Sequence, residues 1–324
     1  MQSDHKKVVV LGAGISGLTS AYLLSKEGFE VTVLEKNDKV GGSIETVIEN
    51  GLLFDRGPNS ALETTPIIAQ LVEELNLKDQ FVYASKKGNR RYILKDNKLH
   101  PLPMSPPAFI RTKLFSRSAK FRLMKEPFVK RSLDGYYQSI SDFVTRRLGQ
   151  EFLDYAINPF VAGVYAGNPE DLSVKSAFPK LYALEEEYGG LIVGTIKSIR
   201  KRKKRKEKSK QSAKMLSFKD GMKVFPEAIA NHLGEKVKLS CRITEIKKTN
   251  DGRYGVIFNE NGKTSTIFTD VVLSTVPSYN AAELFAHMDE KIQKHLDSVF
   301  YPPVLVLYLA YNKEDVGQSL DGFG

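Results

Sequence analysis

The sequence predicts an α/β fold whose first domain is built on parallel strands, and three observations near the N-terminus support this. Lys6–Leu11 is a short continuous apolar run rich in valine, which is typical of a strand buried on both faces. The glycine-rich run Gly12–Gly17 follows at once, and Leu18–Lys26 has the pattern of a helix. Phe29–Leu34 is a second apolar strand that ends at Glu35. The order strand, turn, helix, strand requires a crossover that places the two strands parallel.

Each glycine of the turn has a physical task in a Rossmann unit that binds a dinucleotide. Gly12 permits the tight turn, Gly14 lets the backbone approach a pyrophosphate, and Gly17 lets the helix pack on the strand. The helix N-terminus offers N–H groups and a positive dipole to the phosphates. Glu35 can accept hydrogen bonds from ribose hydroxyls. We therefore expect dinucleotide binding. The alternative is a purely structural turn, and the unit does not say which dinucleotide is bound.

Composition limits the remaining classes of protein. With 324 residues, 41% hydrophobic and 27% charged, the chain can form two globular domains. Its one cysteine, Cys241, rules out an intrachain disulfide framework and favours a reducing, cytoplasmic location. The five histidines are scattered, so no metal site is expected. The N-terminal apolar run is too short for a secretory signal, and no apolar segment approaches the roughly 18 residues of a membrane span.

The net charge of +10 has a local source. Residues 197–214 contain eleven Lys or Arg and one acidic residue, Glu207, so the rest of the chain is neutral overall. Such a run can bind nucleic acid or anionic lipid, but a block of like charges is more often a solvated, disordered insertion. Because it lacks aromatic residues for base stacking, nucleic acid is not an expected partner.

The rest of the chain divides into segments with the character of one domain or the other. A hairpin that turns at Asn50-Gly51, a helix over 65–75 and a loop over 55–60 complete the first nucleotide-binding half. A second hairpin turns at 95–97, and further helices are expected over 139–148 and 151–160, followed by a turn-rich connection over 163–172. The later elements are a helix over 222–233, strands over 237–246, 254–258, 264–268 and 270–276, and a last strand over 304–311.

The return of short apolar strands after residue 215 predicts that the chain re-enters the first domain. We expect a cofactor domain formed by residues 1–80 and 215–278, and a substrate domain of mixed α+β content formed by 81–214 and 279–324. Within the second domain, residues 109–131 interleave apolar and basic side chains. They could rest on the inner face of a membrane as a peripheral contact or pack on their own domain, and both interpretations stay open.

Several motifs together carry a resemblance to a known family. They are the opening unit with Glu35, the run Val40-Gly41-Gly42, the loop Arg56–Ser60 and the strand Asp270–Pro277. These resemble the glutathione-reductase-like FAD oxidoreductases of the amine oxidase and phytoene desaturase group. Within that group, three further segments resemble the oxygen-dependent porphyrinogen oxidases of haem biosynthesis, which act on protoporphyrinogen or coproporphyrinogen III: Asn89–Tyr92 with Leu99–Pro103, Gly163–Asn168 with Leu172-Ser173, and Leu216–Gly221.

The resemblance implies a glutathione-reductase-like FAD domain and assigns cofactor contacts. Gly12, Gly14 and Gly17 would face the pyrophosphate. The remaining implied contacts are Glu35 and Lys36 at the adenosine ribose, Gly41 and Gly42 beneath the flavin side of the dinucleotide, Gly57, Pro58 and Asn59 near the isoalloxazine, and the main chain of Ile243 at the adenine. Ile243 can serve equally as a core residue, since only its backbone is implicated.

The resemblance also implies a substrate and its recognition. A porphyrinogen is an electron-rich macrocycle with propionate carboxylates, and its six-electron oxidation would use the flavin with oxygen as acceptor, without a catalytic side chain. Arg91 matches the arginine that pairs with a substrate carboxylate, although a solvated hairpin arginine is the alternative. Arg90 should point to the opposite face of its strand. Gly167 would lie against the macrocycle, or serve simply as a turn glycine.

Two rival functions remain at this stage. One is a related FAD amine oxidase or carotenoid desaturase. The other is a non-catalytic remnant that binds porphyrin or a membrane but no flavin, because relatives of this type continue for over a hundred residues into a segment that closes over the flavin. The sequence does not separate protoporphyrinogen from coproporphyrinogen, and it leaves membrane attachment and a homodimer open.

Overall fold

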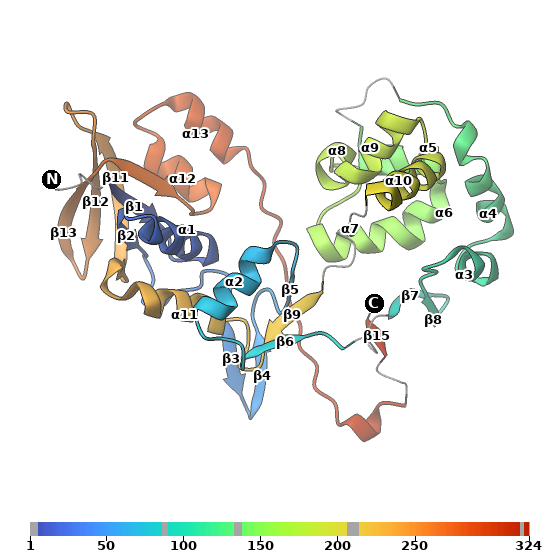
Figure 1. Ribbon diagram of the computed structural model, residues 1–324, viewed down its shortest axis with the longest axis horizontal. Helices are drawn as coiled ribbons and strands as arrows, with labels where there is room; N and C mark the ends of the chain where they lie inside the picture. Colours follow the sequence, from blue (N-terminus) through green and yellow to red (C-terminus); the bar gives the residue numbers. More distant parts are fainter. Residues whose placement is uncertain (1–5, 86–89, 133–137, 206–213, 318–320, 324) are drawn as a thin grey trace. The chain divides into compact units, whose positions relative to one another are not determined.

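The computed structural model describes residues 6–85, 90–132, 138–205, 214–317 and 321–323. The chain forms two compact units, and each is composed of two separate stretches of sequence (Figure 1). The first unit contains Met1–Ala84 and Ser212–Tyr301, and the second contains Ser85–Gln211 and Pro302–Gly324. Residues 279–301 therefore pack with the first unit, and their assignment to the second domain was wrong.

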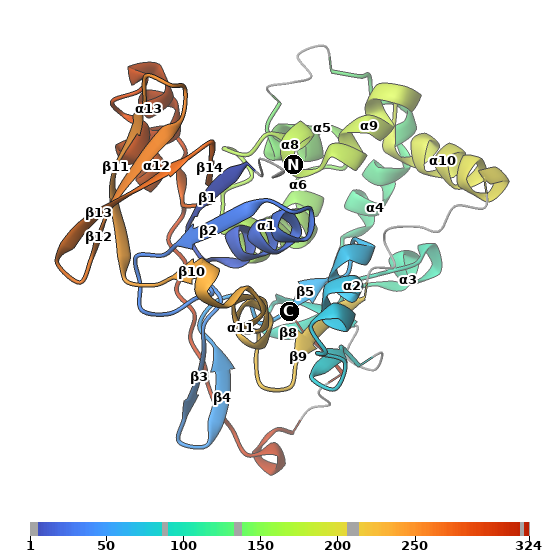
Figure 2. The same ribbon diagram turned by 60° about the vertical axis from the view of Figure 1, so that its left-hand side comes forward.

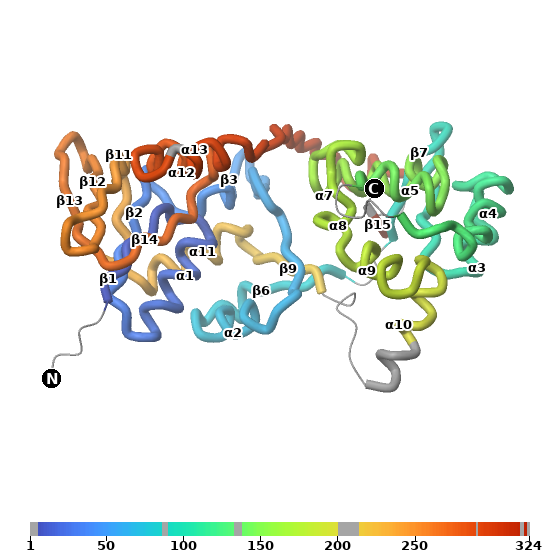
Figure 3. The backbone as a smooth tube through the Cα atoms, turned by 90° about the horizontal axis from the view of Figure 1, so that it is seen from above, coloured from blue at the N-terminus to red at the C-terminus, as the bar shows by residue number. Residues whose placement is uncertain are grey.

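A four-stranded parallel sheet is the centre of the first unit. Its strand order is β10-β2-β1-β14, and β1 pairs with β2 on one side and β14 on the other. The bounds are Lys7–Leu11 for β1, Glu30–Leu34 for β2, Val237–Lys238 for β10 and Val271–Ser274 for β14. The tube in Figure 3 shows the N-terminal strands and the late strand β14 side by side. The predicted re-entry of the chain into the first unit is thus confirmed.

The valine run of β1 is explained by burial on both faces of the sheet. Val8 and Val10 belong to a core cluster with helices α1 (Ile15–Lys26), α2 (Pro66–Glu74) and α11 (Val224–Leu233). Val9 and Leu11 belong to a second cluster with an antiparallel meander. Its strands are β11 (Cys241–Lys248), β12 (Tyr254–Glu260) and β13 (Lys263–Thr269). The result is three layers, with helices on one face of the parallel sheet and the meander on the other (Figure 2).

Two small sheets and a helix pair complete the first unit. The predicted hairpin is present as β3 (Thr46–Glu49) and β4 (Leu52–Asp55), which pair antiparallel. A sheet of order β5-β9-β6 joins segments from both stretches of sequence. Its strands are β5 (Ala61–Leu62), β6 (Phe81–Tyr83) and β9 (Met215–Phe218). Helices α12 (Ser278–Phe285) and α13 (Glu290–Asp297) follow β14.

The second unit is mainly helical, with one small sheet. The predicted hairpin is present as β7 (Arg90–Lys95) and β8 (Lys98–Pro101), and β15 (Gly322–Phe323) pairs with β7 in parallel. The helices are α3 (Pro106–Arg111), α4 (Arg117–Met124), α5 (Ile140–Arg147), α6 (Gln150–Phe152), the π-helical segment η3 (Leu153–Ile157), α7 (Asn158–Tyr165), α8 (Val174–Ala177), α9 (Pro179–Tyr188) and α10 (Leu191–Arg205). Two clusters, one around Phe143 and one around Phe115, form its core.

A buried arginine links three parts of this helical unit. The Arg147 side chain is fully buried, and its guanidinium donates to Glu126 Oε1 at 3.0 Å and to Glu185 Oε2 at 2.9 Å. It also donates to the carbonyl oxygens of Val129 and Gly189. Burial acts to raise the pKa of Glu185, but hydrogen bonds from the two neighbouring arginines and from a backbone N–H lower that pKa below its ordinary value. The network therefore holds Glu185 as a carboxylate.

Three differences from the sequence expectations have physical explanations. The strand expected over 304–311 was wrong: the structure contains no strand there, and Leu305 is 95% exposed. Apolar, β-prone residues do not make a strand until another strand pairs with them, and none of the described strands does. The strand expected over 237–246 is divided between β10 and β11, which belong to different sheets, and Ser240 between them has a φ of +55°. The expected helix 151–160 is divided into α6, η3 and α7, and α7 continues to Tyr165. Residues 206–213 of the basic run lie outside the described residues.

Candidate functional site

The glycine turn between β1 and α1 is held by close backbone contacts. Gly12 has a φ of +97°, which favours glycine. A Cβ on Gly17 would lie 2.0 Å from the carbonyl oxygen of Gly12, so only glycine allows the helix to approach the turn this closely. Thr275, at the end of β14, donates its hydroxyl to the carbonyl oxygen of Leu11 at 2.8 Å. Packing and backbone conformation within the fold therefore explain why residues 12 and 17 are glycines.

Gly14 differs, because no contact among the described residues requires a glycine there. It is the N-cap of α1, with a φ of −70° and a ψ of 173°, and no heavy atom lies within 4 Å of a Cβ built on it. No side chain caps the helix, so the N–H groups of its first turn have no side-chain acceptor. Helix α1 also begins three residues earlier than expected, at Ile15, which places these N–H groups directly at the turn. Open space above uncapped N–H groups fits a diphosphate.

Glu35 is buried at the end of β2 and connects this strand to the glycine turn. Its Oε2 accepts a hydrogen bond from the Ala13 N–H at 2.8 Å, and its Oε1 accepts one from the Asn37 N–H at 2.9 Å. Since each carboxylate oxygen has a second acceptor position, ribose hydroxyls can still bind there. Lys36, the next residue, is exposed. Glu35 thus has a structural role that its spacing alone did not indicate.

The loop that contains Gly41 and Gly42 lies beside the glycine turn. The Gly41 N–H donates to the Ala13 carbonyl at 2.9 Å, and Gly41 has a φ of +106°. A Cβ on Gly42 would lie 3.3 Å from the Cα of Gly14. The structure therefore brings two predicted glycine motifs, about 28 residues apart in the sequence, into direct contact.

A second contact brings Gly57 to the same loop. A Cβ on Gly57 would lie 1.9 Å from the carbonyl oxygen of Ser43, so the two backbones touch. Pro58 and Asn59 are exposed, and the Asn59 carbonyl accepts a hydrogen bond from Ser217 of β9 at 3.0 Å. One connected set of backbone segments therefore includes residues 12–17, 41–43 and 57–59.

Buried contacts that the sequence did not indicate hold this set of segments to the start of α11. Thr46 donates its hydroxyl to Asp55 across the β3–β4 hairpin, and Asp55 accepts the Met222 N–H at 3.0 Å. Thr46 also accepts the Lys223 N–H at 3.1 Å. Gly221 has a φ of +88°, and a Cβ there would lie 2.2 Å from the Thr46 side chain. In the sequence, a threonine and an aspartate that flank a hairpin are only a weak signal of such contacts. No neighbouring residue indicated that they would bind the backbone N–H groups of residues 222 and 223.

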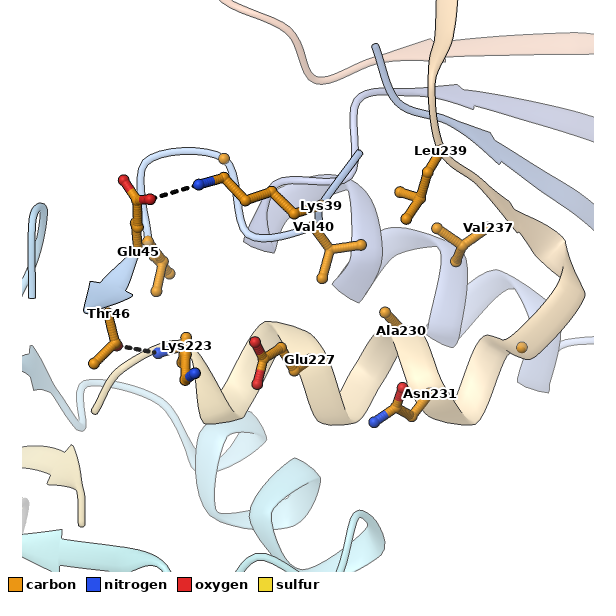
Figure 4. Close-up of a pocket in the computed structure, with 13 residues that line it drawn as sticks. Lys39, Val40, Glu45, Thr46, Lys223, Glu227, Ala230, Asn231, Val237 and Leu239 are labelled. Carbon is orange, nitrogen blue, oxygen red and sulfur yellow. Dashed lines mark hydrogen bonds and ion pairs between the residues drawn. The ribbon is translucent and has the colours of Figure 1, made fainter. Parts of the chain in front are cut away.

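A cavity of about 650 Å³ lies between this loop and α11, and it includes Gly42 in its lining. Figure 4 shows the Lys39–Glu45 ion pair on one side, with Lys223, Glu227 and Asn231 along the helix. The hydrogen bond from Lys39 lowers the pKa of Glu45 below its ordinary value. The cavity thus has both charges and an apolar side, and it adjoins the proposed cofactor segments through Gly42.

Ile243 lies on β11, near the point where that strand hydrogen-bonds to the backbone of Glu35. The Cys241 N–H donates to the Glu35 carbonyl at 2.7 Å, and Ile243 follows two residues later, paired with Phe258. Its side chain packs partly buried against the second core cluster. The core interpretation therefore holds, and the backbone contact to adenine remains a prediction. Burial raises the pKa of the Cys241 thiol, so it is not set up as a reactive thiolate.

The two predicted substrate residues both lie in the second unit. Arg91 is exposed on β7, and Ile93 on the same face of the strand packs against the cluster around Phe115. A Cβ on Gly167 would lie 3.1 Å from a Leu172 methyl carbon. Gly167 therefore lies close to the Leu172 side chain inside the protein, and its role toward a substrate remains a prediction.

Two kinds of feature are absent from the described residues. No group of three or more His, Cys, Asp or Glu side chains in that part of the chain is arranged to hold a metal ion. Among the described helices, none combines the length and apolar character needed to cross a bilayer.

Comparisons with known proteins extend over nearly the whole chain. Residues 15–322 match the family described as flavin containing amine oxidoreductase. Protoporphyrinogen oxidase 2 of Arabidopsis thaliana is 33% identical over 98% of this chain and 67% of its own length, and protoporphyrinogen oxidase 1 is 34% identical over 98% and 62%. Coproporphyrinogen III oxidase of Bacillus subtilis is 30% identical over 100% and 70%. The chain thus spans roughly three fifths to two thirds of the length of its plant relatives.

Solved structures of other proteins align with most of this chain. A structure from Exiguobacterium sp. 255-15, given a provisional protoporphyrinogen oxidase name, has a TM-score of 0.67 and 26% identity, and it aligns over 88% of this chain and 62% of its own. Putrescine oxidase aligns with a TM-score of 0.60 at 19% identity over 86% and 60%, which shows the shared fold alone.

Proposed function

The chain belongs to the family of flavin-containing amine oxidoreductases, and we propose that its first unit is a glutathione-reductase-like FAD domain. The observation that carries this proposal is the open, uncapped N-terminus of α1 at Gly14. The parallel sheet, the helices on one face and the meander on the other supply a frame of the required type.

The cofactor contacts follow the connected backbone segments of the first unit. The Gly14 turn and the first N–H groups of α1 would bind the diphosphate, and Glu35 with Lys36 would bind the adenosine ribose. The main chain of Ile243 would bind adenine. The further contacts would come from Gly12 and Gly17 at the turn, Gly41 and Gly42 beside it, and Gly57, Pro58 and Asn59 near the isoalloxazine.

The proposed reaction is oxidation of a porphyrinogen to the porphyrin in haem biosynthesis. Relatives named protoporphyrinogen oxidase and coproporphyrinogen III oxidase support it. Bound FAD would supply the two-electron acceptor, so a six-electron oxidation takes three rounds, with three molecules of oxygen reduced to hydrogen peroxide. The protein's own tasks are to bind the macrocycle, orient it and exclude water. Arg91 would pair with a propionate, and Gly167 would leave room for the ring.

The second unit would then be the substrate domain, at the periphery of a membrane. Five large apolar side chains between residues 104 and 128 are 59 to 87% exposed, which is unusual for a surface that faces water alone: Met104, Ile110, Phe121, Met124 and Phe128. Basic residues such as Arg117 and Lys125 lie between them in the sequence. Such a surface suits the inner face of a membrane with anionic lipids, and co-sedimentation with anionic against neutral vesicles measures it.

A substrate comparison tests the proposed reaction. The purified chain is loaded with FAD and mixed in air with protoporphyrinogen IX, coproporphyrinogen III or putrescine. Porphyrin fluorescence and hydrogen peroxide are followed, with flavin-free protein and free FAD correcting for spontaneous oxidation. The proposal expects accelerated porphyrin formation and no peroxide from the amine. Peroxide from putrescine without porphyrin formation would favour an amine oxidase, and a protein that takes up no FAD would favour the non-catalytic alternative.

A further inference from the structure

The β3–β4 hairpin separates two of the backbone segments that would bind the flavin end of FAD. Residues 41–45 lead into β3, which begins at Thr46, and residues 56–59 follow β4, which ends at Asp55. Thr46 and Asp55 are paired across the hairpin, so this pair lies where one segment ends and the other begins. Contacts that fix the pair therefore fix one end of each segment.

Other contacts hold the opposite ends of the two segments. The Gly41 N–H donates to the Ala13 carbonyl in the glycine turn, and the Asn59 carbonyl accepts the Ser217 hydroxyl of β9. The buried Ile44 side chain adds apolar packing, which does not fix direction as hydrogen bonds do. The hairpin end of each segment therefore depends on contacts of its own.

Thr46 and Asp55 supply these contacts, by hydrogen bonds to the backbone just before α11. The two residues are 8% and 7% exposed, so little water competes for the bonds. Asp55 Oδ1 accepts the Met222 N–H at 3.0 Å, and Thr46 Oγ1 accepts the Lys223 N–H at 3.1 Å, the bond drawn in Figure 4. Thr46 also donates its hydroxyl to Asp55. The pair thus satisfies two N–H groups that precede the first helical residue and take no part in the hydrogen bonds of the helix.

Gly221 allows the backbone before α11 to come this close to the hairpin. It has a φ of +88°, and a Cβ there would lie 2.2 Å from the Thr46 side chain, so a larger residue would push the two apart. Helix α11 in turn packs with α1 in one core cluster, and α1 begins at the turn that would bind the diphosphate. The Thr46–Asp55 pair therefore connects the flavin-side segments to the diphosphate turn through two packed helices.

We propose that Thr46 and Asp55 are positioning residues that set where the flavin ring binds relative to the diphosphate. This inference rests on the proposed FAD domain. It goes further because it divides the cofactor site into two halves with different supports. The adenosine diphosphate half depends on the glycine turn and Glu35, whereas the flavin half depends on the hydrogen bonds of the Thr46–Asp55 pair.

Comparison of FAD with ADP in threonine variants of the full chain tests the proposal. Thr46→Val keeps the size and branching of the side chain but removes the hydroxyl, whereas Thr46→Ser keeps the hydroxyl and removes the methyl group. Thr269→Val is the matched control, because Thr269 is also buried and its hydroxyl donates to the Lys7 carbonyl at 2.7 Å, at the end of β1 opposite to the glycine turn. Isothermal titration calorimetry measures both affinities, and iodide quenching of flavin fluorescence measures the exposure of the bound ring.

Thr46→Val is expected to weaken FAD binding about three- to tenfold, the usual range for loss of a hydrogen bond, and to change the affinity for ADP by less than about twofold. Iodide should also quench its bound flavin more strongly. Thr46→Ser and Thr269→Val should bind both nucleotides like the unchanged chain, since the first keeps the hydrogen bonds and the second loses a bond elsewhere.

Three results would overturn the proposal. They are an equal loss of FAD and ADP affinity in Thr46→Val, unchanged binding of both nucleotides by this variant, and a Thr46→Ser variant that behaves like Thr46→Val. If Thr46→Val does not fold, Asp55→Asn replaces it with the same expectations, because asparagine keeps the size of the side chain and exchanges one carboxylate oxygen for an N–H donor. Failure of the unchanged chain to bind FAD would instead contradict the proposed FAD domain itself.

Discussion

Gly14 offers a way to separate cofactor binding from folding, because serine there is expected to affect the two in opposite directions. The backbone of Gly14 has N-cap geometry, and apart from its own neighbours in the chain no atom of the described residues lies within 4 Å of the position of a Cβ. In the Gly14→Ser variant the hydroxyl can accept an N–H of the first turn of α1, which serine does at many N-caps. It then occupies the donors and the space that a diphosphate would use.

The magnitudes follow from these two effects. Replacing glycine by a good N-cap residue in an allowed conformation leaves the free energy of unfolding unchanged or raises it by up to about 1 kcal/mol. Loss of one hydrogen bond to a charged phosphate costs about 1.5–3 kcal/mol. The affinity for FAD should therefore fall on the order of 10- to 100-fold.

Urea unfolding without flavin and titration with FAD by fluorescence quenching measure the two effects. Gly163→Ser is the control, because Gly163 lies in α7 with nothing within 4 Å of its Cβ position, and it belongs to the second unit. This variant should bind FAD like the unchanged chain. If Gly14→Ser binds FAD with unchanged affinity, Gly14 does not face the diphosphate. If it loses stability by several kcal/mol, the open space at Gly14 is not there.

Three other predictions concern stability. Replacement of Arg147 by methionine leaves Glu126 buried without its cation and leaves Glu185 with Arg146 alone, so it should lower the free energy of unfolding by about 3–5 kcal/mol in urea, whereas a loss under 1 kcal/mol would show that the network is not buried as described. Because the pKa of Glu185 is lowered in the folded protein, its contribution is present above the ordinary glutamate pKa and is lost as the pH falls below it; thermal unfolding from pH 7 to 3 should therefore show a steeper acid loss for the unchanged chain than for Glu185→Gln, and parallel curves would refute this. Gly17→Ala places a Cβ 2.0 Å from a backbone oxygen and should destabilise by at least about 1–3 kcal/mol, whereas Gly163→Ala, in open space on a helix, should stabilise by up to about 1 kcal/mol; equal effects in urea would contradict the packing at Gly17.

The elements that the sequence predicted well are those determined locally. The strand of β1, the glycine turn and β2 follow one another within 30 residues, and their apolar pattern and glycine spacing contain the needed information. The hairpin at Asn50-Gly51 is likewise set by a turn that favours positive φ, and both residues have it. The placement of Gly41 beside Gly14 could be anticipated only through the resemblance to a family.

The features that the sequence did not reveal depend on distant partners. Val304–Tyr311 has the composition of a strand, but a strand forms only with a neighbour, and composition does not say whether one is present. The Thr46–Asp55 pair meets the backbone of residues 222 and 223, which lie about 170 residues away in the sequence. The same holds for Asp321, whose partners on β7 are more than 200 residues earlier. No periodicity connects such positions, so their contacts appear only in the folded chain.

Competition among nucleotides for the unchanged chain tests the central claim most directly. FAD is titrated into the protein by fluorescence quenching, alone and in the presence of excess ADP or of excess FMN. If the β1–α1 turn binds the diphosphate and Glu35 the adenosine ribose, FAD binds, ADP displaces it and FMN, which lacks the adenosine diphosphate, displaces it far less. Failure to take up FAD, or displacement by FMN but not by ADP, would contradict the account.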